Sequence, residues 1–66
     1  MRFIERLKEL RAELQLSQGD LAEILDVHLM TVSRWERGIN SPSLRDIVNM
    51  VDLFGVSSDY LLGITD

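Results

Sequence analysis

Apolar residues recur at intervals of three or four along almost the whole chain, and this spacing restricts the fold more than any other feature. In the first segment, Leu7, Leu10 and Leu14 follow Phe3 (or Ile4), with Arg2, Glu5, Arg6, Lys8, Glu9 and Glu13 between them. Residues three or four apart share one face of an α-helix, whereas a half-buried strand alternates at every second residue. No segment alternates in that way, so the sequence predicts an all-α protein.

Capping residues mark the expected ends of the helices. Ser17 and Ser43 each stand three residues before an aspartate, which is the arrangement of a capping box at the start of a helix. Gly38, Gly55 and Gly63 stand where glycine commonly ends a helix. Together with the periodicity, these signals predict helices at about residues 2–14, 18–25, 28–37, 44–54 and 58–62.

The same spacing predicts the core. In the segment 44–54, the expected buried stripe consists of Leu44, Ile47, Val51 and Phe54. In the segment 28–37, the three-residue spacing of Val32 and Trp35 predicts that both face inward. A chain of 66 residues has room for one domain. We therefore expect residues 1–66 to form a single compact five-helix bundle.

The charge of the chain is acidic overall but unevenly distributed. The net charge is −4, and phosphate contacts supply most non-specific affinity for DNA, so the total alone argues against a nucleic-acid partner. Residues 27–45, however, carry three arginines against one glutamate, whereas residues 46–66 carry four aspartates and no basic residue. The acidity therefore lies mainly outside the segment 27–45.

Several classes of function are excluded by the residues that the sequence lacks. There is no cysteine and only one histidine, His28, so no nucleophile–base pair and no usual metal-ligand set is available. A chain this small also has little room for a cofactor pocket. No apolar run is long enough for a signal peptide or a membrane helix. We expect a cytoplasmic protein that is not an enzyme and holds neither metal nor cofactor.

The segments 18–25 and 28–37 are joined by a turn too short to let two helices lie antiparallel. Two short helices joined in this way cross steeply, as in a helix-turn-helix, where the second helix enters the major groove of DNA. A pair of short helices would be weak evidence on its own.

Five stretches in register give more specific evidence. From Leu7 to Gly63 the chain resembles the lambda-repressor-like (Xre or Cro-type) helix-turn-helix family. The matching stretches are "LKELR" at 7–11, "LSQGDLAEIL" at 16–25, "TVSRWERG" at 31–38, "PSL" at 42–44 and "DLFGVSSDYLLG" at 52–63. The resemblance implies a sequence-specific transcriptional regulator, a repressor, which inserts the segment 28–37 into the major groove of double-stranded operator DNA.

The resemblance also implies roles for individual residues. Leu29, Met30, Ser33 and Arg34 would lie nearest the base edges, and Gln18, His28, Arg37 and Asn40 would contact the DNA backbone. Arg11 and Glu36 would form a structural ion pair between the first and third helices. A homodimer would form through the end of the fourth helix and the fifth helix, with Phe54, Val56, Tyr60, Leu61, Leu62 and Ile64 as candidates, most of which would be core in a monomer.

The chain departs from the family pattern at several positions. Gln15 and Asp26 stand where relatives usually carry a glycine in the left-handed conformation, which costs glutamine roughly 1 kcal/mol. His28 replaces the usual Ser or Thr cap, which removes a strong capping oxygen.

Leu29 and Met30 stand where relatives often have polar residues. One interpretation is that they contact the C5 methyl group of thymine. The alternative is that the chain is a protein-interaction module of antitoxin or anti-repressor type, which docks a partner through Leu29 and Met30. The basic residues and the polar loop around the pair favour DNA.

Overall fold

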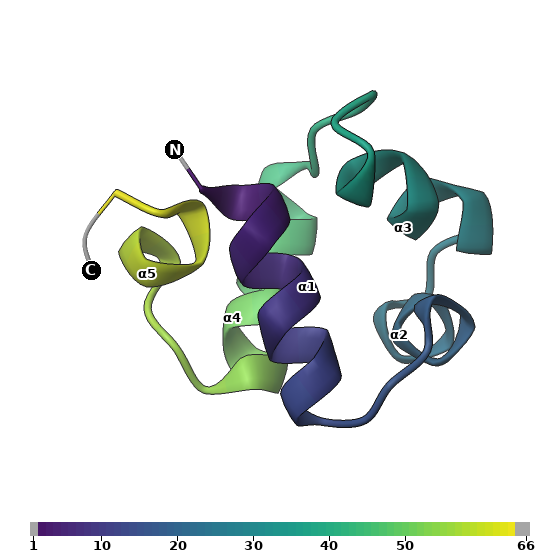
Figure 1. The fold of residues 1–66 in the computed structure, drawn as a ribbon, viewed down its shortest axis with the longest axis horizontal. Helices are drawn as coiled ribbons and strands as arrows, with labels where there is room; N and C mark the ends of the chain where they lie inside the picture. The colour runs from purple at the N-terminus through teal and green to yellow at the C-terminus, as the bar shows by residue number, and fades with distance from the viewer. Residues whose placement is uncertain (1, 65–66) are drawn as a thin grey trace.

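The computed structural model describes residues 2–64, and this part of the chain contains helices and no strand. The helices are α1 (Phe3–Glu13), α2 (Gln18–Leu25), α3 (Leu29–Glu36), α4 (Leu44–Phe54) and α5 (Ser58–Leu62) (Figure 1). The predicted all-α fold is confirmed. The expected bounds of the helices differ from those observed by one residue at most.

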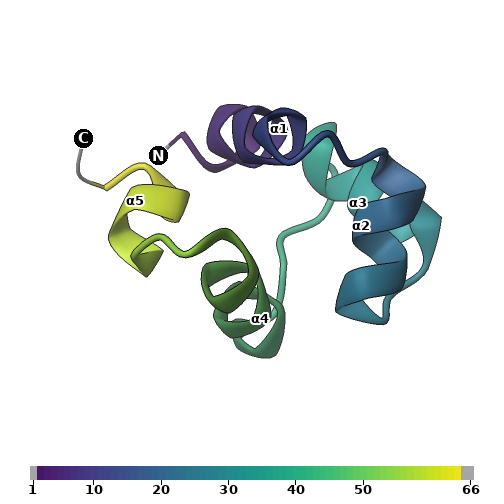
Figure 2. The same ribbon diagram turned by 90° about the horizontal axis from the view of Figure 1, so that it is seen from below.

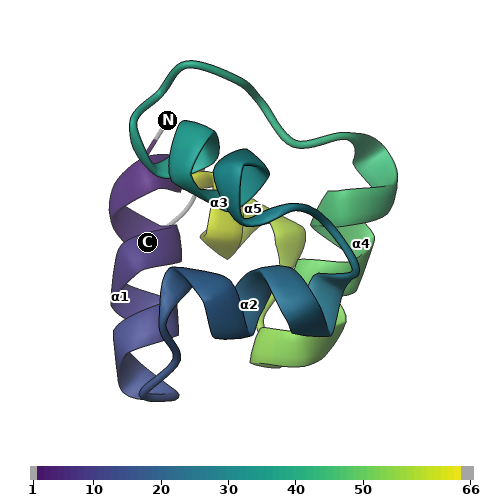
Figure 3. The ribbon, with the colours of Figure 1, turned by 90° about the vertical axis from the view of Figure 1, so that its right-hand side faces the viewer.

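The helices are arranged with α2 and α3 at one end of the molecule and α5 at the other (Figures 1 and 2). Helices α1 and α4 lie between the two ends, and α1 contacts both α3 and α5. The loop after α3 passes over the top of the bundle to reach α4 (Figure 3). In this arrangement, one side of the α2–α3 pair packs on the core and the other side is exposed to solvent.

Serine side chains begin α2 and α4, as the capping boxes predict. The Ser17 hydroxyl accepts a hydrogen bond from the Asp20 backbone N–H at 3.0 Å, and the Asp20 carboxylate accepts one from the Ser17 N–H at 3.0 Å. These hydrogen bonds from Ser17 hold the pKa of Asp20 below its ordinary value. The same reciprocal pair joins Ser43 and Asp46 at the start of α4. Each box satisfies N–H groups that have no partner within the helix.

The core is built from one to three residues of each helix. Its largest fully buried side chains are Trp35, Leu7, Leu21, Met50, Leu61 and Val32. Val32 and Trp35 are 0% and 1% exposed, so the prediction that they face inward is confirmed. Because both belong to α3, their burial fixes which face of that helix remains outside.

The predicted buried stripe of α4 was wrong at Leu44, which is 80% exposed. Leu44 is the first residue of α4, at the end that lies away from α2 in Figure 3. Ile47, Val51 and Phe54 are only partly buried, whereas Met50 is fully buried. The reason is that α4 packs between α2 and α5, which centres its buried face on Met50.

Two residues in or beside α1 differ from a simple division into one apolar and one charged face. Leu14 follows the last residue of the helix and is 47% exposed. Arg6, which the pattern groups with the exposed charges, is buried, and its guanidinium lies 4.0 Å from the centre of the Tyr60 ring. A cation over an aromatic face is attracted by the ring quadrupole. Because α1 contacts α5 as well as α3, a wider part of its surface is covered than one apolar stripe predicts.

Candidate nucleic-acid interface

The turn between α2 and α3 depends on a left-handed residue. Asp26 ends α2 with φ +56°, and the N–H of Val27 then donates to the Ala22 carbonyl at 2.9 Å. Gln15, in the turn before α2, has φ +57°. Both residues adopt the conformation expected for the glycines that they replace. The turn sets α3 across α2, and the two helices pack against each other.

The first turn of α3 has a cap of an unexpected kind. The Nδ1 atom of His28 accepts a hydrogen bond from the Met30 backbone N–H at 3.0 Å. An imidazole nitrogen therefore takes the place of the capping oxygen that His28 lacks. The sequence did not predict this cap. This bond requires Nδ1 to be unprotonated, so the ring proton of neutral His28 lies on Nε2. The Nε2–H group remains a donor toward an anion.

The outer face of α3 carries an apolar pair followed by polar side chains. Leu29 and Met30 are 46% and 42% exposed, Arg34 is exposed and Ser33 is half-buried. The structure brings these four predicted residues onto one helix, opposite the buried Val32–Trp35 edge. Leu29 and Met30 are thus available to a partner.

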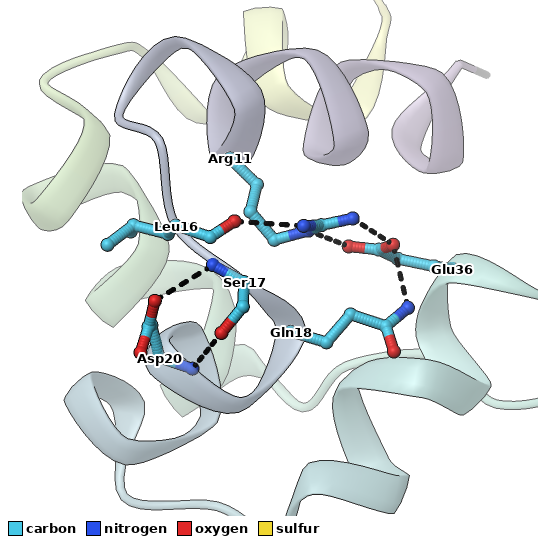
Figure 4. Close-up of polar contacts among 6 residues, drawn as sticks. All are labelled: Arg11, Leu16, Ser17, Gln18, Asp20 and Glu36. Atoms are coloured by element: carbon cyan, nitrogen blue, oxygen red, sulfur yellow. Dashed lines mark hydrogen bonds and ion pairs between the residues drawn. The ribbon is translucent and has the colours of Figure 1, made fainter.

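A polar cluster beneath this face joins three helices. Arg11 of α1 donates to both carboxylate oxygens of Glu36, from Nε to Oε2 at 2.7 Å and from its terminal nitrogen to Oε1 at 3.0 Å (Figure 4). It also donates to the Leu16 carbonyl at 2.9 Å. Gln18 of α2 donates its amide to Glu36 Oε1 at 3.0 Å. The structure thus contains the ion pair that the resemblance implies, and adds Gln18 to it.

The protonation of Glu36 reflects this cluster. Burial raises the pKa of Glu36, but hydrogen bonds from Arg11 and Gln18, with the charges of Arg11 and Lys8, outweigh it and leave the pKa below its ordinary value of 4.5. The hydrogen bond to Glu36 in turn raises the pKa of Arg11. Both side chains therefore stay charged near neutral pH, and α3 is attached to α1 by a paired charge.

Gln18 lies in a different environment from the one that the sequence suggests. Its half-buried side chain is turned toward Glu36. An amide group has two N–H donors and a carbonyl oxygen, so the bond to Glu36 uses one of its donors. The signal that could have placed Gln18 here is the predicted Arg11–Glu36 pair, since a buried carboxylate attracts further donors.

The loop after α3 folds back on the helix. The carbonyl of Arg34 accepts the Ile39 N–H at 2.9 Å, and Gly38, with φ +75°, makes the reversal. Arg37 and Asn40 are exposed, and Arg37 Nε points back to the Ser33 carbonyl at 3.4 Å. The guanidinium side chain of Arg37 remains exposed despite this long contact.

Residues 2–64 show neither a cluster of metal-ligating side chains nor a helix that could span a membrane. In this part of the chain, no three histidine or acidic side chains are grouped so that they could hold a metal ion. No helix among these residues is long and apolar enough to cross a membrane.

Known proteins resemble this chain over most of its length. A family model described as helix-turn-helix matches residues 7–61. The chain is 36% identical over 59 residues to the HTH-type transcriptional regulator ImmR of Bacillus subtilis, covering 89% of this chain and 46% of that protein. It is 37% identical over 62 residues to the HTH-type transcriptional activator BcrR of Enterococcus faecalis, covering 94% of this chain and 30% of that protein.

A solved structure is also similar. The crystal structure of a transcriptional regulator from Listeria innocua matches with a TM-score of 0.89 and 30% identity, over 97% of this chain and 60% of that one. The chain thus spans less than two thirds of the length of each of these three proteins.

Proposed function

This chain belongs to the helix-turn-helix family, and on that premise we propose that it binds double-stranded operator DNA and regulates transcription. The observation that carries the proposal is the two-sided character of α3. Its Val32–Trp35 edge is buried, whereas Leu29 and Met30 are exposed beside Arg34. In a helix-turn-helix, the outer face of the second helix is the one that enters the major groove.

Base reading is assigned to four residues of α3. Arg34 supplies a guanidinium that can donate two parallel hydrogen bonds to guanine O6 and N7. Ser33 can donate to or accept from a base edge, and Leu29 and Met30 present apolar surface. These residues span the first two turns of α3, which is the part of a recognition helix that contacts bases.

Backbone contacts are assigned to the residues that surround this face. Arg37 is the C-cap of α3 and Asn40 lies in the loop that follows. Both are exposed and can reach phosphate oxygens. His28 has its Nε2–H free of the cap bond, and Gln18 has its second amide N–H. Such contacts fix the register of a protein on DNA without reading sequence.

We further propose that the protein acts as a repressor and binds as a symmetric homodimer. The dimer would form through Phe54, Val56, Tyr60, Leu62 and Ile64. Of these, Ile64 is 59% exposed and the others are half-buried, so the surface available for a solution dimer is small and assembly on DNA is favoured. Two-fold symmetry would then place the half-sites roughly 34 Å apart.

The test begins with selection of bound sequences from a random duplex pool. We expect enrichment of a palindrome, and we expect Arg34→Ala to weaken binding to it by about 1–3 kcal/mol. Arg34→Lys keeps the charge but loses the two-pronged donor geometry, so it should bind DNA with reduced preference for the selected sequence.

A control matched in charge is Ser58→Asp, which lowers the net charge by the same one unit as Arg34→Ala. Ser58 is an exposed residue of α5, at the end of the molecule opposite α3 (Figure 1). Because Val56 and Tyr60 of the proposed dimer surface flank Ser58, the number of protomers bound per duplex is measured for both variants. If Ser58→Asp bound with unchanged stoichiometry and still weakened binding as much as Arg34→Ala, overall charge and not α3 would be responsible. If no sequence were enriched, the proposal of specific DNA binding would fail.

The exposed Leu29–Met30 pair also supports a second candidate, a protein-interaction module that docks a partner through this pair. In that case Arg34→Ala and Arg37→Ala would leave binding of the partner intact, and Leu29→Ala with Met30→Ala would abolish it. The DNA proposal gives Arg34 and Arg37 a role, because Arg34 would contact bases and Arg37 would contact phosphate. A protein-docking surface does not require either arginine.

A further inference from the structure

The apolar start of α3 points to the chemistry that it reads. We infer that Leu29 and Met30 recognise the C5 methyl group of thymine, and that the half-site places this thymine about two base pairs from a guanine read by Arg34. The inference rests on the proposed DNA binding and specifies the sequence class of the DNA.

The first step concerns the chemistry of these two side chains, which offer apolar contact surface. Leu29 and Met30 occupy the first two positions of α3 and are 46% and 42% exposed. In the major groove, the thymine methyl is the one strongly apolar group that a base pair presents. A leucine or methionine placed against a polar base edge would desolvate groups that it cannot hydrogen-bond.

The second step concerns spacing along the helix. Met30 and Arg34 are four residues apart and therefore lie on the same side of α3, one turn from each other. With a rise of about 1.5 Å per residue, their Cα atoms are separated by about 6 Å along the axis. Base pairs are spaced by about 3.4 Å. A helix lying along the groove would therefore set methyl contact and guanine contact about two base pairs apart.

The third step concerns the rigidity of the reading face. The first turn of α3 is capped by the His28 imidazole, and the last turn is held to α1 and α2 through Glu36. Val32 and Trp35 fix the rotation of the helix on the core. The apolar pair and Arg34 therefore keep a constant separation, as a two-point reading of sequence requires.

The experiment uses the duplex enriched by selection with the wild-type chain. Each thymine is replaced singly by deoxyuridine, which pairs identically but lacks the C5 methyl, and the dissociation constant is measured at one salt concentration. Loss of one buried methyl should weaken binding about fourfold. We expect this at one or two thymines near a guanine, and no change at thymines elsewhere in the duplex.

The assignment to Leu29 and Met30 is tested by repeating the series with Leu29→Ala and Met30→Ala, alone and together. These side chains are half-exposed, and an unchanged circular dichroism spectrum and melting temperature would verify the fold. In the double variant the fourfold effect should disappear. Replacing deoxyuridine at the sensitive position by a 5-methylcytosine–guanine pair tests the methyl with different hydrogen-bonding groups, and should restore part of the affinity for wild type only.

Three outcomes would overturn the inference. Deoxyuridine could have no effect at any position although the selected duplex binds, in which case DNA binding stands and methyl reading fails. The methyl effect could persist in the double variant, in which case it arises in the DNA or from another residue. No duplex could be enriched at all, in which case the proposed function fails with it.

Discussion

Arg11 and Glu36 are joined by two hydrogen bonds, of 2.7 and 3.0 Å, although 25 positions of sequence separate them. The side chain of Glu36 is 2% exposed and that of Arg11 is 22% exposed. The pair is therefore unequal, because one partner reaches solvent and the other does not. Removal of Arg11 should therefore destabilise the fold more than removal of the Glu36 charge. The first change leaves a buried carboxylate without its counter-charge, whereas the second leaves a guanidinium that can still reach water.

We expect Arg11→Ala to lower the free energy of unfolding by about 3 kcal/mol, since it leaves the Glu36 carboxylate buried with the Gln18 amide as its remaining side-chain donor among residues 2–64. Glu36→Gln should cost less, because Arg11 keeps its bond to the Leu16 carbonyl and reaches water. Urea denaturation of both variants checks the order. Equal losses would contradict the asymmetry of exposure.

The same pair predicts a dependence of stability on pH. Burial raises the pKa of Glu36, but the bonds from Arg11 and Gln18 leave it below 4.5 in the folded protein. A group with a lowered folded pKa contributes its stability in full above the unfolded pKa and loses it as the pH falls through the folded value. The gap in unfolding free energy between wild type and Glu36→Gln should therefore be constant above pH 5 and shrink below about pH 4.5.

Gln15 predicts a gain in stability. Its φ of +57° places a β-carbon in the left-handed region, so Gln15→Gly should raise the free energy of unfolding by up to about 1 kcal/mol. Asp26→Gly should gain less, because aspartate tolerates this conformation better. Thermal melts of the two variants test the order. A loss of stability in Gln15→Gly would mean that the Gln15 side chain makes a contact that stabilises the fold by more than the backbone strain destabilises it.

Two glycines in the same conformation should respond differently to alanine. Gly55 and Gly63 have φ values of +67° and +74°, but a β-carbon at Gly55 meets nothing within 4 Å, whereas a β-carbon at Gly63 would collide with the backbone nitrogen of Arg2. Gly55→Ala should cost about 1 kcal/mol for strain alone. Gly63→Ala should cost clearly more, because the start of α1 must shift. Similar losses in chemical denaturation would contradict this packing.

The cap of α3 can be tested at His28. His28→Ala removes the acceptor of the Met30 N–H and should cost about 1 kcal/mol, whereas His28→Asn supplies a side-chain oxygen and should preserve or improve stability. Unfolding by urea checks both. If alanine and asparagine behaved alike, the bond from Met30 to the imidazole would contribute little to stability.

Arg37 predicts a change in salt dependence. If it contacts phosphate, Arg37→Ala should weaken binding to all sequences alike and reduce the slope of log affinity against log salt by about 1. Arg34→Ala should instead flatten the preference among sequences. Titrations on selected and scrambled duplexes at several salt concentrations distinguish the two. An unchanged slope for Arg37→Ala would remove it from the phosphate contacts.

Features that depend on neighbours in sequence were predictable. The capping boxes at Ser17 and Ser43 and the glycines at 38, 55 and 63 mark helix ends, because each acts within a few residues. Val32 and Trp35 were predictable because two large apolar residues three apart define one face of α3.

Features that depend on packing between helices were not predictable in the same way. Periodicity describes one helix at a time and does not say how many others cover it. Arg6 is buried because α5 covers a second side of α1, and Met50 replaces Leu44 in the core because α4 lies between two partners. The turn of Gln18 toward Glu36 and the imidazole cap of His28 need atomic positions that residue types do not specify.

The separation of α3 from α5, at opposite ends of the bundle (Figure 1), has a consequence for how such a chain can change. Leu29, Met30 and Arg34 are surface residues, so they can be exchanged without altering the buried set or the far end of the molecule. On the proposed assignments, DNA preference resides on α3 and self-association on the opposite end of the bundle, so a new DNA specificity can arise by changing a few outward side chains of the same scaffold.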